Sequence, residues 1–428
     1  MYAAYSAFYV VVFLARLKGF QRLTSTDEAV QLFFDILRIE RLKVVTVPLS
    51  EALHRVLGED IVTEEDLPRF DRAAVDGYAI KAEDTFGASQ FKPKLFRIAE
   101  KNEVESGLAR QVWTGNSIPN DADAVVMLEN TKQVEDRIEV WTPLTPGENV
   151  SKRGEDVQKG KIAVKTGTRL KPQHLGLIVA LGNRSAKVVE KPLVAVLATG
   201  NELVEVGAKL GESQIFETNR LTISSLCREL GAEPLDLGIV KDDINEILEK
   251  LHTGIKKADA IITTGGTSVG VSDLVPLAVN KLGKPGVIVH GVAMRPAMPT
   301  ALAVVENKPI LILSGNPVAA MIGFEVFARP LIQKMLGIKH EPRPVVKAKM
   351  TRKAATTLGR KTFVRVRVFE QNGEFFAEPI SARGSGAIST MTRANGYVIV
   401  PENREGLTEA ETVIAHLFDE IAASDENV

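Results

Sequence analysis

The chain has almost none of the residues from which disulfides and zinc sites are built. Cys227 is the only cysteine among 428 residues, which excludes an internal disulfide and any metal site made of several cysteines. It falls in the run 218–230, whose pattern predicts a helix, so we interpret it as a buried structural thiol. The six histidines are scattered with no pair at ligand spacing, which argues against a zinc site.

An excess of basic charge and a long apolar run are missing as well. The formal net charge is −1, whereas a protein whose main partner is nucleic acid carries a strongly basic face. The apolar run from Tyr2 to Ala15 is too short to span a bilayer, and no basic residues precede it as in a secretory signal. We therefore expect a cytoplasmic protein without nucleic-acid or membrane partners, and a weakly ordered N-terminal extension over residues 1–20.

Two common nucleotide-binding motifs are absent, although residues 260–273 come close to one of them. This stretch begins as an apolar strand, continues as the glycine-rich turn Gly265–Gly270, and enters a helix at Asp273. Val271 stands where a P-loop requires lysine, and no G-x-G-x-x-G motif follows any strand. Such a strand, turn and helix hold anionic groups through loop amides and the positive end of the helix. A tight turn whose glycines serve only packing explains the residues equally well.

Alternating strands and helices predict the fold class, an α/β multidomain protein. Continuous apolar strands between residues 193 and 313 alternate with helices, which is typical of a parallel sheet covered on both faces. Asn316 and Pro317 fit the start of one long helix that ends at Leu336. Short alternating runs predict β structure over residues 85–148 and again after Gly337. The predicted segments are the extension 1–20, an elongated N-terminal mixed domain (21–60 and 149–187), an inserted small β domain (61–148), a central α/β domain (188–338) and a C-terminal β-barrel with a short tail (339–428).

Acidic residues follow the successive strands of the predicted parallel sheet. Glu202 comes after the first strand, Asp242 and Asp243 after the second, and Asp273 after the third. Each of them alone has an ordinary role as a helix cap or turn residue. Together, beside an anion-binding loop, they predict a Mg²⁺ site for phosphate or pyrophosphate chemistry.

Several motifs together resemble the molybdopterin molybdenumtransferases, the MoeA family that includes the E domain of gephyrin. The motifs occur in the family's order and cover nearly all of residues 22–420. They are Val75-Asp76-Gly77-Tyr78-Ala79, Thr114-Gly115, Arg153-Gly154-Glu155-Asp156, Thr199-Gly200-Asn201-Glu202-Leu203, Thr218-Asn219-Arg220, Thr264–Gly270 with Asp273, and Gly315-Asn316-Pro317-Val318.

The resemblance implies a Mg²⁺-dependent transferase that inserts molybdate or tungstate into adenylylated molybdopterin and releases AMP. It implies a central domain resembling MogA, and a homodimer whose site lies between the sheet domain of one subunit and the inserted β domain of its partner. Pathway contacts would be a molybdopterin adenylyltransferase and apo-molybdoenzymes. The implied catalytic residues are Asp76, Thr114, Asp156, Glu202 and Asp273. The implied metal ligands are Glu202, Asp242 or Asp243, and Asp273. The implied substrate-binding residues are Gly265, Gly266, Thr267, Ser268, Gly270, Arg295, Asn316, Pro317, Arg365 and Ser385.

The sequence also departs from the family and leaves rival functions open. Where the family often has Lys-Pro-Gly-Lys-Pro, this chain has Arg295-Pro296-Ala297-Met298-Pro299, so one lysine is replaced by methionine. The charge that holds the oxyanion must then come partly from elsewhere, and the Arg365 guanidinium suits a tetrahedral oxyanion. The alternatives are molybdopterin adenylyltransferase, which would consume ATP rather than release AMP, and a non-catalytic scaffold like gephyrin.

Overall fold

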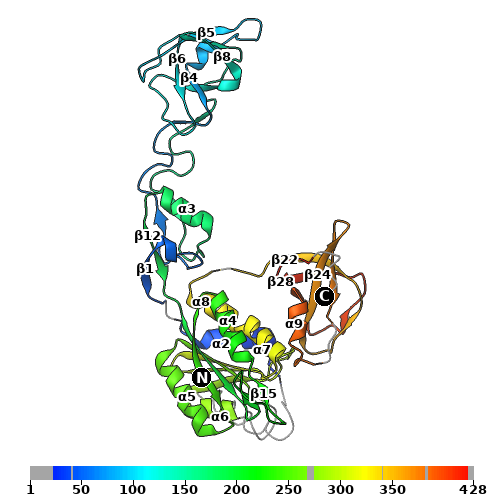
Figure 1. Cartoon of the computed structure of the whole chain (residues 1–428). Coiled ribbons are helices and arrows are strands. Elements are labelled where there is room, and N and C mark those ends of the chain that lie inside the picture. Colours follow the sequence, from blue (N-terminus) through cyan, green and yellow to red (C-terminus); the bar gives the residue numbers. More distant parts are fainter. Residues whose placement is uncertain (1–22, 40–41, 268–273, 340, 381–383, 423–428) are drawn as a thin grey trace. The chain divides into compact units, whose positions relative to one another are not determined.

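The computed structural model describes residues 23–39, 42–267, 274–339, 341–380 and 384–422 (Figure 1). The predicted extension 1–20 lies outside these residues. The chain forms two compact units, one made of Val45–Val188 and the other of Met1–Val44 with Val189–Val428, and each is described by itself. No helix in the described part of the chain has the length and apolar character needed to cross a membrane.

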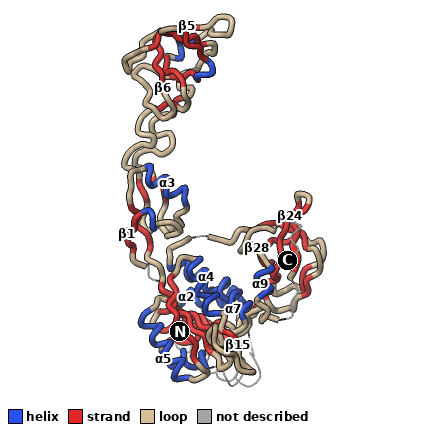
Figure 2. Tube along the Cα trace, viewed as in Figure 1, coloured by secondary structure: helices blue, strands red, loops and turns tan. Residues whose placement is uncertain are grey.

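A six-stranded sheet forms the centre of the larger unit (Figure 2). Its first four strands are parallel, as predicted, and two antiparallel strands extend it at one edge. The order is β16 (Glu233–Val240), β13 (Leu193–Thr199), β17 (Ala260–Thr264), β21 (Lys308–Leu313), β20 (Ala301–Val305) and β18 (Pro285–His290). Strands β17, β20 and β13 are buried almost throughout, which explains their continuous apolar sequences.

Amphipathic helices cover this sheet. Side chains of α5 (Ile244–Lys257) and α6 (Leu274–Leu282) share one apolar core with β13, β17, β20 and β21. Helix α4 (Asn219–Glu229) contacts β13, β16 and α7, whereas α2 (Thr26–Ile36) contacts β18 and β20. The small pair β14 (Leu203–Val204) and β15 (Ile215–Phe216) follows β13.

The predicted long helix from Pro317 is present and ends at Met335, one residue before the predicted Leu336, but it is not α-helical throughout. The segment consists of α7 (Pro317–Gly323), a π-helical turn η5 (Phe324–Ala328) and α8 (Arg329–Met335). Pro330 explains the change, because proline has no N–H to donate to the preceding turn and its ring crowds the carbonyl there.

The C-terminal part of the same unit is a closed β-barrel, which confirms the predicted fold class. Strand β24 pairs with both β25 and β26, so five strands form a ring around an apolar core. The ring consists of β24 (Lys361–Gln371), β25 (Glu374–Pro379), β22 (Val345–Met350), β28 (Thr412–Leu417) and β26 (Gly396–Val400). A short strand from the α/β part, β19 (Met294–Arg295), adds to β24 in parallel. The barrel also carries α9 (Ser389–Arg393) and the small pair β23 (Ala354–Ala355) and β27 (Gly406–Leu407).

The smaller unit contains a six-stranded sheet over its own apolar core. The order is β7 (Ala124–Met127), β4 (Gly77–Ile80), β6 (Leu108–Val112), β5 (Lys94–Ile98), β9 (Arg137–Val140) and β8 (Thr131–Val134). Two-stranded ladders continue the unit: β1 (Val44–Pro48) with β12 (Ser185–Val189), β2 (Ile61–Val62) with β11 (Ile162–Val164), and β3 (Arg72–Ala73) with β10 (Val150–Ser151). Its helical segments are η2 (Leu49–Glu51), η3 (Ala82–Thr85), η4 (Leu128–Asn130) and α3 (Pro172–Ala180).

Candidate functional site

The glycine-rich turn after β17 has a conformation that only glycine suits. Gly265 has φ of +90° and Gly266 of +64°. A Cβ on Gly265 would lie 2.2 Å from the carbonyl oxygen of Thr199, and one on Gly266 would lie 2.5 Å from Cγ2 of Val275. The turn is therefore pressed between the end of β13 and helix α6, and its backbone can lie close to a ligand at the carboxyl edge of the sheet.

Part of the predicted anion-binding loop lies outside the described residues. Thr267 is described and buried. Ser268 and Gly270, predicted to bind substrate, and Asp273, predicted as a catalytic residue and metal ligand, are not among the described residues. The role of the complete Gly265–Gly270 loop stays a prediction.

The Gly315–Pro317 motif packs directly against this glycine turn. A Cβ on Gly315 would lie 3.5 Å from the Cα of Gly265. The side-chain amide of Asn219 donates to the carbonyl of Gly315 at 2.8 Å, so a second sequence motif holds the same loop. Asn316 stands at the N-cap position and Pro317 begins α7, but the Asn316 side chain makes no capping hydrogen bond. Its amide is not used to satisfy the helix.

The loop after β25 in the barrel reaches the start of the same helix. The backbone N–H of Val318 donates to the carbonyl of Ser385 at 3.1 Å. A Cβ on the neighbouring Gly386 would lie 3.7 Å from Oδ1 of Asn316. The glycine turn, the start of α7 and the loop after β25 thus lie next to one another, and they contain four of the predicted substrate-binding residues: Gly265, Asn316, Pro317 and Ser385.

The acidic residues after β13 and β16 have different environments. The Glu202 carboxylate folds back over Gly200, where a Cβ would lie 2.7 Å from Oε2. Asp243 caps α5, because its Oδ1 accepts from the backbone N–H groups of Asn245 at 2.8 Å and Glu246 at 3.0 Å.

Asp242 is the better candidate for a metal ligand. Its backbone N–H donates to Oδ1 of Asn201 at 3.2 Å, which links the loops that follow β16 and β13. Its carboxylate is exposed and does not serve a helix. Within the described ranges no three Asp, Glu, His or Cys side chains are grouped as a metal site. The predicted set would be completed only by Asp273.

Two arginines of the larger unit, Arg295 and Arg365, lie close enough for their positive charges to repel each other. Strand β19 places Arg295 beside β24, which carries Arg365. Burial and the neighbouring charge of Arg295 both lower the pKa of Arg365. The Arg365 Nε is buried and has no hydrogen-bond partner in the part of the chain that is described. Arg295 donates to the Thr357 hydroxyl at 3.3 Å. A buried guanidinium donor without a carboxylate to neutralise it is suited to an anion.

The smaller unit brings Asp76 and Thr114 together, as the sequence motifs suggest. Asp76 Oδ1 accepts from both the backbone N–H and the hydroxyl of Thr114, each at 2.7 Å. The backbone bond is the larger cause, and the hydroxyl the second, of a lowered pKa for Asp76. The next residue must be glycine, because a Cβ on Gly77 would lie 1.9 Å from the carbonyl oxygen of Val126. Asp76 is held ionised on the surface of this unit.

Asp156 belongs to a separate cluster in the smaller unit. Its backbone N–H donates to the carbonyl of Leu67, and its side chain is exposed. The neighbouring Arg153 contacts Asp66 through Nε at 2.7 Å and donates its backbone N–H to Asp71 at 2.8 Å. Among the described residues, no hydrogen bond or ion pair joins Asp156 to Asp76 or Thr114. Asp66 was missed by sequence reasoning, because its partners are about ninety positions away.

Comparisons with known proteins agree on one family. Residues 24–182 match the MoeA N-terminal region (domains I and II), residues 195–334 a probable molybdopterin-binding domain, and residues 347–418 the MoeA C-terminal region (domain IV). A Methanocaldococcus jannaschii protein named for molybdopterin biosynthesis is 38% identical over 388 residues, covering 89% of this chain and 93% of its own. The molybdopterin molybdenumtransferase of Bacillus subtilis is 36% identical over 87% of this chain and 90% of its own. A crystal structure of the MoeA protein from Pyrococcus horikoshii superposes with a TM-score of 0.81 at 35% identity, covering 93% of this chain and all of that one.

Proposed function

The chain belongs to the MoeA family of molybdopterin molybdenumtransferases, and from this premise we propose that it inserts molybdate into adenylylated molybdopterin with release of AMP. The observation that carries the proposal is the pair Arg295 and Arg365. Arg365 has a buried Nε donor without a partner in the described part of the chain, and burial first and the charge of Arg295 second lower its pKa. A doubly charged tetrahedral oxyanion would accept a hydrogen bond from the unpaired Nε and would also offset the repulsion between the two positive charges.

The oxyanion would be held between the barrel and the start of α7. Arg365 would donate from β24, Arg295 from β19, and Ser385 from the loop that contacts Val318. Since Met298 stands where the family often has a lysine, the two guanidinium groups supply the positive charge. Tungstate has nearly the same size and shape as molybdate, so both anions belong in the assay.

The pterin nucleotide would lie along the carboxyl edge of the six-stranded sheet. The Gly265–Gly266 turn allows phosphate oxygens to approach the backbone, and Asn316 has a side-chain amide that the helix does not use. These residues would fix the phosphates so that the phosphorus–oxygen bond to AMP is presented to the acidic residues. Thr267, Ser268, Gly270 and Pro317 complete the proposed substrate-binding set.

The donor set at this edge fits Mg²⁺, which prefers carboxylate oxygens. Glu202 and Asp242 would hold the ion with Asp273, whereas Asp243 remains a helix cap. A bound Mg²⁺ would offset phosphate charge and polarise the bond that releases AMP.

Asp76, Thr114 and Asp156 would act across a homodimer. We propose that the smaller unit of one subunit brings these residues to the sheet edge of its partner. Asp76 is suited to such a role because its carboxylate is exposed and its Oδ1 is held by two hydrogen bonds from Thr114. A molybdopterin adenylyltransferase and apo-molybdoenzymes remain the proposed contacts before and after this step.

Two alternative functions can be separated from molybdate insertion. An adenylyltransferase would form the adenylylated pterin from ATP and would not release AMP from it. A scaffold would keep its biological role in an Asp273→Asn variant that still folds. The barrel argues for insertion, because it adds Arg365 and Ser385 to a sheet domain that would suffice for adenylyl transfer alone.

Variants of Arg365 and Asp242 test the proposed site. Arg365→Met should raise the KM for molybdate with little change in the KM for the pterin nucleotide. Asp242→Asn should lower kcat and raise the Mg²⁺ requirement, whereas Asp243→Asn should change neither, because the asparagine oxygen can cap α5 about as well as the aspartate. Equal kinetic effects of Asp242→Asn and Asp243→Asn would contradict the assignment.

A further inference from the structure

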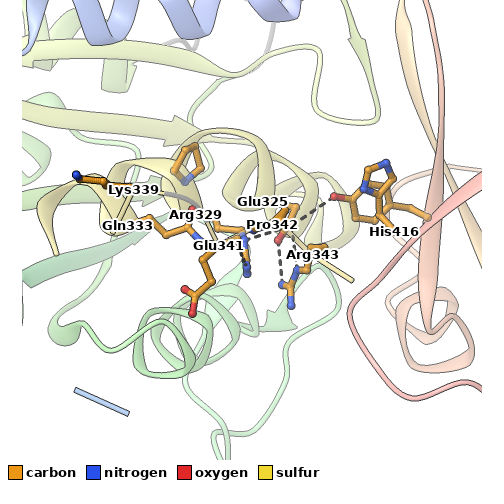
Figure 3. Close-up of a pocket in the computed structure, with 10 residues that line it drawn as sticks. Glu325, Arg329, Gln333, Lys339, Glu341, Pro342, Arg343 and His416 are labelled. Atoms are coloured by element: carbon orange, nitrogen blue, oxygen red, sulfur yellow. Dashed lines mark hydrogen bonds and ion pairs between the residues drawn. The ribbon is translucent and has the colours of Figure 1, made fainter. Parts of the chain in front are cut away.

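The π-helical turn η5 places a carboxylate between the α/β part and the barrel. Glu325 is in this turn, nine positions after Asn316 on the same helical segment. Its carboxylate is forked by Arg343, with Nε to Oε1 at 3.0 Å and Nη2 to Oε2 at 3.0 Å. Arg343 belongs to the linker between α8 and β22, and both side chains are only 14% exposed. Figure 3 shows these residues pointing toward each other.

The barrel contributes a third member of this cluster. The Tyr397 hydroxyl on β26 donates to Oε1 of Glu325 at 3.3 Å. Its ring stacks on His416 of β28, with ring centroids 5.2 Å apart, and packs edge-on against Phe363 of β24 at 5.7 Å. Burial first, and the Glu325 charge second, raise the pKa of Tyr397 well above its usual range, so the phenol stays protonated and can donate.

The remaining charges around Glu325 come from the helices and the linker. Arg329 Nε lies 3.8 Å from Oε1 of Glu325, and Arg343 Nη1 lies 3.4 Å from Oε1 of Glu229 at the end of α4. Arg329 and Gln333 both donate to the carbonyl of Glu341 in the linker. A pocket of about 280 Å³ opens beside this cluster (Figure 3). The buried charges are therefore paired, and removing one partner would leave the other buried without compensation.

Tyr397 connects this cluster to the proposed oxyanion site. In the barrel Tyr397 is the direct cross-strand partner of Arg365. Glu325 continues the helical segment that begins at Asn316 and Pro317. The barrel thus touches this segment twice, at its start through Ser385 and in η5 through Tyr397.

We propose that Glu325, Arg343 and Tyr397 form a latch that positions Arg365 relative to the start of α7, and so sets the affinity for the oxyanion. This inference rests on the proposed function, because it takes Arg365 to be a ligand of the oxyanion. Its members are positioning residues: they act through Arg365 and Ser385. Losing the latch should weaken binding of the oxyanion, which needs both sides, more than binding of the pterin nucleotide, which needs mainly the sheet edge.

Steady-state kinetics of three variants test the latch. Glu325→Gln removes the negative charge that forms the bidentate ion pair with Arg343, and Tyr397→Phe removes only the hydroxyl. Each should raise the KM for molybdate, by about tenfold for Glu325→Gln, since small misplacements of a binding group have effects of this order. The KM for adenylylated molybdopterin should change by less than about twofold. The matched control is Glu411→Gln, which breaks the fork made by Arg404 within the barrel at 2.8 and 3.0 Å and should change neither KM.

Hydrogen exchange measures the same latch without reference to activity. Glu325→Gln and Tyr397→Phe should speed exchange of amides in the linker 341–345 and in the loop 384–388, whereas Glu411→Gln should not. The inference is overturned if both KM values rise equally, if the control behaves like the latch variants, or if exchange is unchanged. Absence of molybdate-dependent AMP release from the parent protein would instead refute the proposed function, and the exchange experiment would still decide whether the latch exists.

Discussion

Ala297 has a backbone conformation that glycine adopts more easily. Its φ is +77°, and it stands where the family run often has glycine. A left-handed conformation costs an L-residue about 1–2 kcal/mol. Glycine avoids this cost, but its larger conformational entropy in the unfolded state offsets part of the gain in stability. We predict that Ala297→Gly stabilises the protein by about 0.5–1 kcal/mol, seen as a higher melting temperature. The control is Ala320→Gly inside α7, which should destabilise the protein by about 1 kcal/mol. A lower melting temperature for Ala297→Gly would contradict the prediction.

The Thr114 hydroxyl contributes to the lowered pKa of Asp76. Thr114→Val removes the hydroxyl bond but keeps the larger backbone bond, so the pKa of Asp76 should rise partway toward 3.8. Because the folded pKa lies below the unfolded one, the stabilisation is present above pH 3.8 and is lost as the pH falls through the folded pKa. The variant should therefore lose stability relative to the parent above pH 3.8, and the difference should shrink in acid.

An NMR titration of the Asp76 side chain measures this directly. Thr131→Val is the matched control in the same unit, because its hydroxyl donates to the Leu128 carbonyl and touches no acid. An unchanged Asp76 pKa in Thr114→Val, or an equal change in the control, would show that the hydroxyl bond is not formed in solution.

The turn after β17 depends on its glycines for steric reasons. Gly265→Ala would place a Cβ 2.2 Å from the Thr199 carbonyl oxygen, a backbone atom that cannot move aside cheaply. We predict a loss of more than about 1 kcal/mol in the free energy of unfolding, together with weaker nucleotide binding. Gly176→Ala in α3 meets no heavy atom within 4 Å and should stabilise by about 0.5–1 kcal/mol. Normal nucleotide affinity in Gly265→Ala would remove this turn from the site.

Elements with a regular pattern could be predicted from the sequence, whereas interrupted ones could not. The apolar strands β13, β17 and β21 can be predicted from their composition, and β24 and β25 are joined by Asn372-Gly373, a pair typical of a two-residue hairpin turn. Strand β20 was not predicted, because Glu306 and Asn307, which both have positive φ, were not recognised as its turn to β21. The π-helical turn after Gly323 is followed by Pro330, but the apolar pattern alone predicts an α-helix throughout this segment.

Contacts between distant residues explain what the sequence could not reveal about the site. Tyr397 and Glu325 are 72 positions apart, and neither belongs to a motif. The choice of Asp243 as a helix cap and Asp242 as the freer carboxylate depends on backbone geometry that two adjacent aspartates do not disclose. Strand pairing brings Asp76 to Thr114, since Asp76 directly precedes β4, Thr114 follows β6, and these two strands pair in antiparallel orientation.

The proposed homodimer makes a prediction for the whole molecule. If Asp76 of one subunit completes the sheet edge of its partner, Asp76→Asn and Asp242→Asn homodimers should both be nearly inactive. Mixing them after dissociation and reassociation should restore up to about one active site in each mixed dimer. Size-exclusion chromatography with light scattering checks that dimers have formed. No recovery in verified mixed dimers would contradict a shared site, as would a fully active monomer.

Release of AMP is the most direct test of the proposed reaction. Purified protein would be incubated with adenylylated molybdopterin and Mg²⁺, with molybdate, tungstate or no oxyanion added, and AMP would be followed over time. We predict AMP release that requires an oxyanion, with the preferred anion also giving active cofactor in an apo-molybdoenzyme, and a raised KM for that anion in Arg365→Met. No AMP release from folded protein, or release that is indifferent to the oxyanion, would contradict molybdate insertion as its function.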